Sequence, residues 1–296
     1  MYSPSPEHLE ALQKSAPDAE ILSAKDEQSA QKSIVEADAV LGNRFFLQSL
    51  PYAKRLRWMQ SNSVGMDLLF GSGRIPSHLQ ITSAKGVYDN EVAEHAIALL
   101  LALLRNIPLF CDQQRSVSWR RCPLRTISGA RCLILGWGKI GQAIGERLRA
   151  LGAEVSAVSR RGPQEWRELL PTTDALVMAL PFTPLTARFI GREELACLPA
   201  TSYLVNVGRG ETLDEIALLA ALREERLAGA ALDVFMHEPL LAESPLWSEP
   251  RLLITPHVAR SIESDPPRWE PLFVENLRRF SRGEPLLNCV DHQLGY

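Results

Sequence analysis

The chain has 296 residues, a length that favours two domains over one. With 46% hydrophobic residues it can bury a substantial core, and its net charge of −3 argues against a basic surface for nucleic acid or an anionic membrane. The five cysteines are scattered, without a CxxC pair or the histidine spacing of a zinc site, and the first residues lack a basic-then-apolar signal sequence. We therefore expect a cytoplasmic protein with free thiols, no metal, and neither nucleic acid nor a membrane among its partners.

Helix and strand patterns alternate over residues 1–90. Ser5 and Pro6 favour a helix start, with serine as the cap and proline at the first position, and this helix is expected to end near residues 16–17. The elements expected after it are a strand at 20–23, a helix at 27–37, and strands at 39–42, 56–60 and 80–83. This alternation predicts a small α/β unit with a parallel sheet.

The next stretch is strongly apolar and then irregular. Residues 91–104 are expected to form a long helix that is apolar on most of its surface, buried between structural units, and the candidate joint between domains. Its most apolar part, 96–104, is too short to span a bilayer. Residues 105–128 have no clear periodicity and place Trp119 among several arginines. Two interpretations stay open for them: an arm that packs on a second subunit, or a solvated basic loop.

A strand, a glycine turn, a helix and a second strand follow one another over residues 131–161. The apolar run 132–135 has the pattern of a strand buried on both faces and leads directly into GWGKIG at 136–141. Gly136 permits the tight turn, Gly138 leaves room for a pyrophosphate, and Gly141 lets the helix lie close to the sheet. Glycine turns also connect strands to helices without a ligand. In this context, however, the pattern predicts a dinucleotide-binding motif with phosphate at the helix N-terminus.

The second strand of the motif, 154–158, ends in Ser159-Arg160-Arg161. An NAD-binding chain usually carries an acidic residue here for the ribose 2'-hydroxyl. An acid would repel a 2'-phosphate, whereas a hydroxyl and two guanidinium groups would bind it. The sequence therefore favours NADP(H) as the cofactor, with NAD(H) as the second candidate. The simpler alternative is two solvated arginines on a loop.

Later apolar runs predict four more strands whose loops lie on one side of the sheet. These strands are expected at 174–180, 203–207, 229–234 and 252–255, with a helix at 213–223 and a last helix, from 271 onward, that crosses back to the first domain. In an open α/β sheet, ligands bind outside the carboxyl ends of the strands. These ends carry Arg209, Asp233, Glu238 and His257.

An arginine, a glutamate and a histidine at such strand ends form a coherent set for reducing a 2-oxo acid. Hydride delivery to a carbonyl builds negative charge on its oxygen, so the site needs a proton donor with a pKa near neutrality, which histidine supplies. A carboxylate beside the histidine favours imidazolium, and an arginine can hold the substrate carboxylate and polarise its carbonyl. Taken singly, Arg209 also fits a loop salt bridge, Glu238 a surface acid and His257 a satisfied buried histidine.

Several segments resemble the D-isomer-specific 2-hydroxy-acid dehydrogenase family. They are LILGWGKIGQAIGERL, LPFTPLTARFIG, LVNVGRGETLDEIALLAAL, GAALDVFMHEPL, SPLW and LLITPHVA, and the resemblance runs from about residue 60 to the C-terminus. It implies a doubly wound parallel-sheet (Rossmann) cofactor domain at 91–261, inserted into a smaller flavodoxin-like α/β substrate domain at 1–90 and 262–296. It also implies a homodimer built on the cofactor domains.

The same resemblance implies roles for individual residues. Arg209 would anchor the substrate, Glu238 would be the partner of His257, and His257 would be the acid/base, so these three are the expected catalytic residues. Asp233 would contact the nicotinamide carboxamide, and the family's loop that binds the substrate carboxylate through backbone amides matches Ser63-Val64-Gly65. The expected cofactor-binding residues are Gly136, Trp137, Gly138, Lys139, Ile140, Gly141, Ser159, Arg160, Arg161, Pro181 and Asp233. The expected substrate-binding residues are Val64, Gly65 and Arg209.

Three features depart from the family pattern. Relatives usually open with a strand before the first helix, so the first sheet is expected to lack a strand or the start to be truncated. Arg260 follows PHVA where a small residue is common, and it either binds a second anionic group of the substrate or points to solvent. Trp137 is bulkier than usual in the phosphate loop, a feature without a functional interpretation.

The sequence favours an NADPH-preferring reductase that converts small 2-oxo acids, such as glyoxylate or hydroxypyruvate, to D-2-hydroxy acids. Formate oxidation is disfavoured, because that branch of the family uses a glutamine where this chain has Glu238. Two alternatives stay open: a nucleotide-sensing corepressor of the same fold with little turnover, and a scaffold whose activity is lost through its short start. The physiological substrate and the direction of flux stay open as well.

Overall fold

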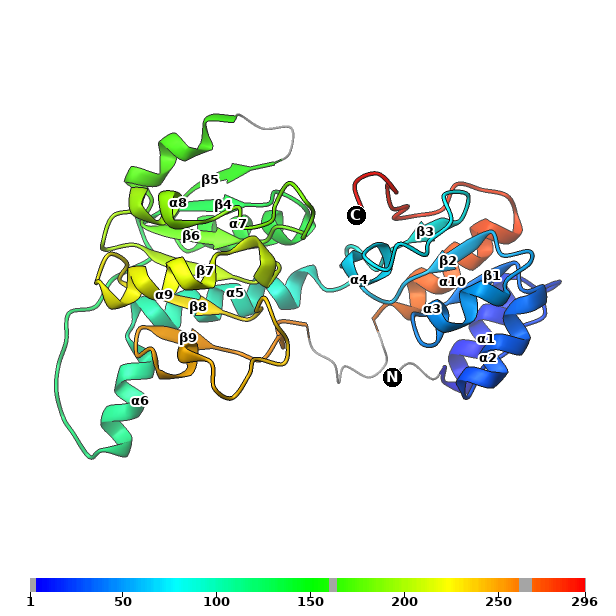
Figure 1. Cartoon of the computed structure of the whole chain (residues 1–296), viewed down its shortest axis with the longest axis horizontal. Helices are drawn as coiled ribbons and strands as arrows, with labels where there is room; N and C mark the ends of the chain where they lie inside the picture. The colour runs from blue at the N-terminus through cyan, green and yellow to red at the C-terminus, as the bar shows by residue number, and fades with distance from the viewer. Residues whose placement is uncertain (1–3, 160–163, 261–267, 296) are drawn as a thin grey trace. The chain divides into compact units, whose positions relative to one another are not determined.

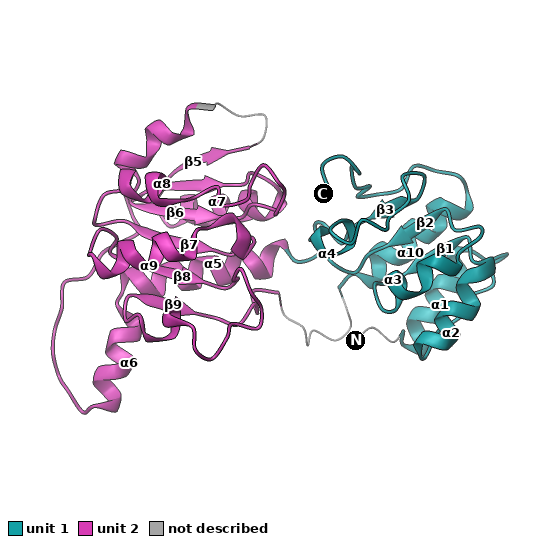
Figure 2. Ribbon diagram, in the orientation of Figure 1, with its two compact units in different colours: residues 1–88, 263–296 teal, residues 89–262 magenta. Residues whose placement is uncertain are grey.

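The computed structural model describes residues 4–159, 164–260 and 268–295. The chain divides into two compact units (Figure 2). Unit 1 takes its residues from 1–88 and 263–296, and unit 2 is the continuous segment 89–262 between them. Both units are built on parallel sheets with helices (Figure 1), so the predicted α/β class is confirmed.

Unit 1 holds a three-stranded parallel sheet in the order β1-β2-β3. The strands are β1 (Ala39–Leu41), β2 (Trp58–Gln60) and β3 (Gln80–Thr82), and the helices are α1 (Pro6–Ser15), α2 (Glu27–Ser33), α3 (Phe46–Ser49), α4 (Asp67–Phe70) and α10 (Glu270–Ser281). The Ser5 hydroxyl accepts a hydrogen bond from the His8 N–H at 3.1 Å, so the predicted helix cap is confirmed. The strand predicted at 20–23 is wrong, because these residues pair with no neighbouring strand in the described chain and Leu22 is 60% exposed.

The sheet of unit 1 is buried on both faces. Met59 and Ile81 lie in an apolar cluster with Phe46 and other residues of the surrounding helices. On the other face, the Trp58 ring packs on Phe280 of α10 at 5.1 Å between ring centroids. The predicted return of the last helix to the first domain is therefore confirmed, since α10 covers a sheet formed by residues 39–82.

Unit 2 holds a six-stranded parallel sheet in the order β5-β4-β6-β7-β8-β9. The strands are β4 (Arg131–Leu135), β5 (Glu154–Val158), β6 (Ala175–Met178), β7 (Tyr203–Asn206), β8 (Gly229–Leu232) and β9 (Leu252–Ile254). The chain starts in the interior at β4, adds β5 on one side, and then continues from β6 on the other side. The topological switch point therefore lies between β4 and β6, beside the loop that follows β4.

Helices cover both faces of this sheet, as a doubly wound fold requires. One face carries α5 (Asp89–Leu104) and α7 (Lys139–Ala150). The other carries the 3-10 segment η3 (Gln164–Thr172) with α8 (Arg192–Cys197) and α9 (Glu215–Arg223). Alternate strand residues such as Leu133, Leu135, Leu176 and Met178 form the core on this second side. Side chains buried on both faces explain why the strands are near-continuous apolar runs in the sequence.

Helix α5 is buried by its own unit rather than by a position between units, which corrects the prediction. It packs on α7, β7 and β8, and the unit boundary falls at its start. Its buried residues are Val92, Ala93, Ala96, Leu99, Leu100, Leu103 and Leu104. Within the described chain, no single helix is long and apolar enough to cross a bilayer, although α5 and α6 together meet that test as a pair bent by 64°.

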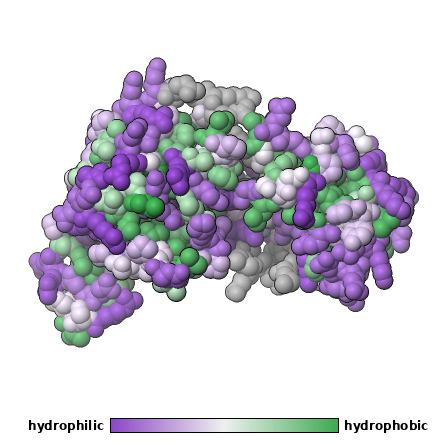
Figure 3. Space-filling view, in the orientation of Figure 1, coloured by the Kyte–Doolittle hydropathy of each residue, from purple (hydrophilic) through white to green (hydrophobic). Residues whose placement is uncertain are grey.

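The segment predicted to lack regular structure contains a helix, α6 (Ile107–Arg115). The helix was missed because Pro108 and a weak apolar stripe obscure its periodicity, although proline is well tolerated in a first turn. In Figure 1, α6 and the chain after it stand away from the sheet of unit 2. We call residues 107–125 the arm. Figure 3 shows hydrophobic surface at the end of this part of the chain. Within the arm, Val117 is 94% and Trp119 92% exposed.

Candidate active site

The glycine loop after β4 is tied to the neighbouring strand β5. The N–H groups of Gly136 and Trp137 both donate to the Val158 carbonyl, at 3.0 and 3.1 Å. Gly136 has a φ of 102°, which favours glycine. A side chain at Gly141 would collide with the Gly136 carbonyl oxygen, so only glycine lets α7 begin this close to the loop. The glycine motif at 136–141 therefore forms the tight strand-to-helix turn that its spacing predicts.

The start of α7 has the features of an anion site. Gly138 is the N-cap residue, and no described side chain caps the helix there. The first N–H groups of a helix have no partner within the helix and lie at the positive end of its dipole. A Cβ added at Gly138 would point into open space, with no atom of the described residues within 4 Å apart from its chain neighbours. The chain thus leaves room at this position for a pyrophosphate, and the residues present fit a dinucleotide.

Trp137 has a structural explanation that the sequence did not provide. Its ring lies against α7 at Gly145, where any side chain would collide with the indole. The guanidinium of Arg149 lies over the same ring, 5.4 Å from its centroid. Trp137 therefore packs on the side of α7. Its indole fits there because residue 145 has no side chain, and Arg149 makes a cation–π contact with it.

The loop after β7 carries Arg209 and is fixed from both sides. The Asn206 side chain at the end of β7 donates to the Arg209 carbonyl at 3.1 Å, and the Thr212 hydroxyl donates to the same oxygen at 2.6 Å. A Cβ at Gly210 would collide with the backbone of Phe235, so this loop touches the loop after β8 main chain to main chain. The Arg209 guanidinium donates to the Gly208 carbonyl at 2.8 Å.

Glu238 and His257, which lie on different loops, meet in the folded chain. The Glu238 carboxylate is 2.6 Å from Nδ1 of His257 with one oxygen, and it accepts the Phe235 N–H at 2.9 Å with the other. Because a carboxylate only accepts, Nδ1 carries the hydrogen of this bond and Nε2 is the nitrogen left for a ligand. Both side chains are partly exposed, His257 at 44% and Glu238 at 34%, so a ligand can reach them.

Asp233 is fully buried and organises the turn that carries His257. Oδ1 accepts from the Thr255 hydroxyl at 2.6 Å and the Val258 N–H at 3.0 Å, and Oδ2 accepts from the Ala259 N–H at 2.9 Å. Burial by itself would raise the pKa of Asp233, but these bonds and one from His95 outweigh it and lower the pKa. The sequence assigned Asp233 to the nicotinamide and did not predict this internal role.

Two further residues at the site, His95 and Glu215, were missed. His95 of α5 contacts both Thr255 and Asp233, at 3.0 and 3.2 Å. Glu215 of α9 accepts the Met236 N–H at 2.7 Å, next to the loop of Glu238, and burial raises its pKa. A single histidine inside a strongly apolar helix was the available signal for His95, since a polar group there needs a partner. The identity of that partner is not contained in the local sequence.

The predicted substrate loop lies in unit 1, directly after β2. Asn43 holds it by accepting the Asn62 N–H at 3.2 Å and donating to the Ser63 hydroxyl at 3.1 Å. The N–H groups of Val64 and Gly65 donate to no acceptor in the described residues. Two adjacent N–H groups without internal acceptors are a feature of anion-binding loops.

The remaining predicted residues lie at the same edge of the unit 2 sheet or outside the described chain. Ser159 follows β5, Pro181 follows β6, and Lys139 and Ile140 begin α7. Arg160 and Arg161, on which the cofactor preference rests, lie outside the described residues. Arg260 is the last described residue of the turn after β9, with intermediate burial.

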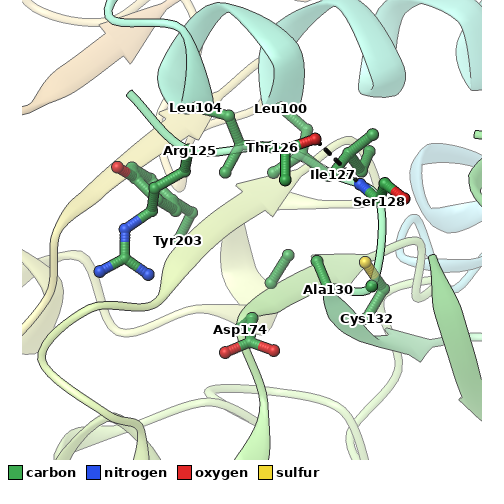
Figure 4. Close-up of a pocket in the computed structure, with 12 residues that line it drawn as sticks. Leu100, Leu104, Arg125, Thr126, Ile127, Ser128, Ala130, Cys132, Asp174 and Tyr203 are labelled. Atoms are coloured by element: carbon green, nitrogen blue, oxygen red, sulfur yellow. Dashed lines mark hydrogen bonds between the residues drawn. The ribbon is translucent and has the colours of Figure 1, made fainter. Parts of the chain in front are cut away.

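A cavity of about 280 Å³ lies at the opposite edge of the same sheet (Figure 4). It is lined where β4, β6 and β7 begin, by Ala130, Asp174 and Tyr203, and by Leu100 and Leu104 of α5. The glycine loop, Arg209, Glu238 and His257 all follow the carboxyl ends of the strands. This cavity is therefore not part of the candidate active site.

The fold, the switch-point glycine loop and the His257–Glu238 pair define a nucleotide-binding α/β oxidoreductase. The sequence profile of the D-isomer specific 2-hydroxyacid dehydrogenase, NAD binding domain, matches residues 97–259. The chain belongs to this family and is an NAD(P)-dependent 2-hydroxy-acid dehydrogenase.

Two similar proteins agree with this assignment. Hydroxyphenylpyruvate reductase of Plectranthus scutellarioides is 35% identical over 248 residues, which cover 80% of this chain and 79% of that protein. Glyoxylate reductase of Pyrococcus furiosus is 31% identical over 276 residues, which cover 86% of this chain and 82% of that one.

Solved structures are also similar over nearly the whole chain. A D-isomer specific 2-hydroxyacid dehydrogenase from Xanthobacter autotrophicus, in complex with NADPH and MES, has a TM-score of 0.85 at 30% identity and covers 99% of this chain and 96% of that one. The NADPH-dependent glyoxylate/hydroxypyruvate reductase of Sinorhizobium meliloti, in complex with NADP and sulfate, has a TM-score of 0.86 at 26% identity, covering 99% and 97%. The predicted family and fold are therefore confirmed.

Proposed function

We propose that this protein reduces small 2-oxo acids of the glyoxylate and hydroxypyruvate type to D-2-hydroxy acids, with NADPH as the preferred reductant. The observation that carries the proposal is the 2.6 Å contact between His257 and Glu238 at the same sheet edge as the glycine loop. A histidine held by a carboxylate beside a nucleotide site is the arrangement that carbonyl reduction needs. The names of the similar reductases support this substrate class.

Each residue has a separate task in this reaction. A reduced nicotinamide dinucleotide would be held at the glycine loop 136–141 and the start of α7, and it would supply the hydride. Negative charge then develops on the substrate carbonyl oxygen. The imidazolium form of His257, with hydrogen on both nitrogens, donates its Nε2 proton to that oxygen and is left neutral, while Glu238 orients the ring through Nδ1. Arg209 binds the substrate carboxylate with its forked guanidinium and polarises the carbonyl. In unit 1, the N–H groups of Val64 and Gly65 are a further carboxylate-binding element.

The preference for NADPH is supported by two observations. The sequence places Ser159, Arg160 and Arg161 after β5, where an acid would select for an unphosphorylated ribose. Solved structures similar to this chain contain NADPH or NADP. Replacing Arg160 and Arg161 together by alanine should raise KM for NADPH by about tenfold or more, because charge-assisted bonds to the 2'-phosphate are lost, and should leave KM for NADH unchanged. An equal rise for both cofactors would contradict the preference.

The activity is tested by following oxidation of NADPH, and separately of NADH, with glyoxylate, hydroxypyruvate, pyruvate and phenylpyruvate. His257→Ala should lower kcat by about a hundred- to ten-thousand-fold, the range of general acid catalysis, while NADPH still binds. His78→Ala, which removes an exposed histidine of unit 1, is the matched control and should leave kcat unchanged. Tight dinucleotide binding without turnover of any of the four acids would contradict the proposal and favour a nucleotide-sensing role.

We also propose a cytoplasmic homodimer that forms through the arm. The arm exposes several large apolar side chains: Ile107, Leu109, Val117, Trp119 and Leu124. Such a set in a well-folded chain is typical of an interaction surface. The free cysteines of the chain suit a reducing compartment. Sedimentation velocity should give a dimer for the wild type and a monomer for Val117→Ser combined with Trp119→Ser; a wild-type monomer at micromolar concentration would contradict the dimer.

A further inference from the structure

His95 reaches the active-site turn from a helix far away in the sequence. It lies on α5 of unit 2, 160 residues before Thr255, and its Nε2 is 3.0 Å from the Thr255 hydroxyl oxygen. The same nitrogen is 3.2 Å from Oδ1 of Asp233, and the imidazole is only 21% exposed. The family match and the active-site chemistry assign no role to this histidine.

The hydrogen bonds determine which nitrogen of His95 carries a hydrogen. Asp233 is ionised and can only accept, and its 2.6 Å contact with the Thr255 hydroxyl uses the single hydrogen of that hydroxyl. Towards His95, the Thr255 oxygen can therefore only accept. Both contacts of Nε2 thus require an Nε2–H, shared between Thr255 and Asp233.

This arrangement makes Asp233 a connection between α5 and the turn of His257. Its carboxylate accepts hydrogen bonds from the side chains of His95 and Thr255. It also accepts hydrogen bonds from the backbone N–H groups of Val258 and Ala259 in the turn. These two N–H groups directly follow His257. His257 itself has a φ of 52°, in the left-handed region that a residue with a side chain seldom adopts. Such a conformation persists only where its surroundings hold it.

We propose that His95 is a positioning residue: its Nε2–H fixes the Asp233 carboxylate, and through it the turn that presents the His257 imidazole to a carbonyl substrate. The inference rests on the proposed function, since His257 must be the proton donor for its position to affect turnover. His95 itself does not touch the reacting groups. A purely structural role, in which His95 only attaches α5 to β9, would alter stability and leave the chemical step intact.

Three variants separate these roles. His95→Leu removes the hydrogen-bond donor and retains a side chain that fills the site. It should lower kcat by about tenfold to a hundredfold, because a small misplacement of a catalytic group has an effect of this size. KM for NADPH should stay unchanged. His95→Gln keeps an N–H at a similar distance from the backbone and should restore kcat to within about threefold of wild type. Glu94→Gln changes an exposed neighbour on the same helix and is the matched control.

Coupling to Thr255 is tested with a double-mutant cycle. If His95 acts through Thr255 and Asp233, the loss of kcat in Thr255→Val and the loss in His95→Leu should not add in the double variant. Fully additive losses would overturn the connection. Unchanged kcat in His95→Leu, or equal losses in His95→Leu and His95→Gln, would overturn the positioning role, provided that the wild type turns over.

The tautomer gives a test that does not depend on turnover. The imidazole ¹⁵N signals of His95, assigned by their loss in His95→Gln, should be those of a ring with hydrogen on Nε2. A ring with hydrogen only on Nδ1 would overturn the inference even in an active enzyme. If the wild type turns over no 2-oxo acid, the proposed function fails and the positioning role fails with it, whereas the expected tautomer would still confirm the hydrogen-bond network.

Discussion

Replacing Asp233 by asparagine should destabilise unit 2 strongly, although the two side chains have nearly the same shape. The carboxylate is 0% exposed, and its two oxygens accept hydrogen bonds from Thr255, Val258 and Ala259. Asparagine offers one acceptor oxygen and one NH₂ group. In either orientation, the NH₂ group faces at least one donor of the turn, and that donor loses its partner inside the protein.

The size of the effect follows from the bonds that are lost. A hydrogen bond to a charged group contributes about 1.5–3 kcal/mol, and a buried donor left without a partner costs about 1–3 kcal/mol more. Asp233→Asn should therefore reduce the free energy of unfolding by about 3–5 kcal/mol, a large part of the 5–15 kcal/mol typical of a whole domain. For a unit of this size, the loss corresponds to a fall in Tm of roughly 6–20 °C.

Scanning calorimetry of the full chain measures this loss in the transition of unit 2. Asp112→Asn is the matched control, because Asp112 is 72% exposed and pairs only with Arg115 in the described chain, so its change should stay within about 0.5 kcal/mol. A loss below about 1 kcal/mol for Asp233→Asn would refute the reasoning, since it would mean that the carboxylate is not the acceptor of these bonds.

The pH dependence of the loss has a defined sign. The pKa of Asp233 is lowered in the folded chain, so its stabilising contribution is complete above the unfolded-state pKa of about 3.9 and disappears as the pH falls through the folded-state pKa. The difference in stability between wild type and Asp233→Asn should therefore be constant near neutrality and shrink in acid. A difference that grows as the pH falls would contradict this sign.

Three further changes have defined outcomes. Gly138→Ala adds a methyl group that no atom of the described chain obstructs, so Tm should stay unchanged. The Kd for NADPH, measured by fluorescence, should rise about tenfold or more, because the methyl group contacts the pyrophosphate. Glu215→Gln keeps an acceptor for the Met236 N–H and removes a carboxylate whose pKa is raised by burial. Thermal unfolding of this variant at neutral pH should therefore show no loss of stability. Glu215→Ala removes the acceptor and should lower the free energy of unfolding by about 1–3 kcal/mol. Asn276→Leu breaks the 2.7 Å bond to the buried Gln60 and should destabilise unit 1 by about 1–3 kcal/mol in urea unfolding; no change would mean that α10 is held by apolar packing alone.

Local features of the sequence predicted local structure well. Ser5 caps the first helix, and the glycines at 136, 138 and 141 form a turn between β4 and α7 as their spacing requires. Apolar runs located the inner strands of unit 2 because strands buried on both faces have few polar positions. Their bounds were predicted too long, as for 174–180 against Ala175–Met178, because the half-buried residues that follow this strand, Ala179 and Leu180, are apolar too.

Predictions failed where a segment depends on a partner elsewhere. Residues 20–23 have strand-like composition, yet a strand forms only beside another strand, and none lies next to them in the described chain. Helix α5 was correctly predicted as buried, but its apolar surface did not say which elements bury it. Helix α6 was missed because Pro108 and a weak apolar stripe obscure its periodicity, and in the fold Ile107 and Leu109 stay exposed.

The sequence by itself determined the strands of unit 2, the nucleotide loop, the family and most of the candidate residues, because each of these is encoded within a few neighbouring positions. Only the tertiary structure decided which groups meet: Glu238 with His257, the Trp137 indole with α7 at Gly145, and His95 with Thr255. The physical reason is that Glu238 and His257 follow separate strands that end at a common edge of the sheet, while His95 and Gly145 lie on helices that pack against that sheet. Their distances depend on the packing of the whole unit, which no local pattern records.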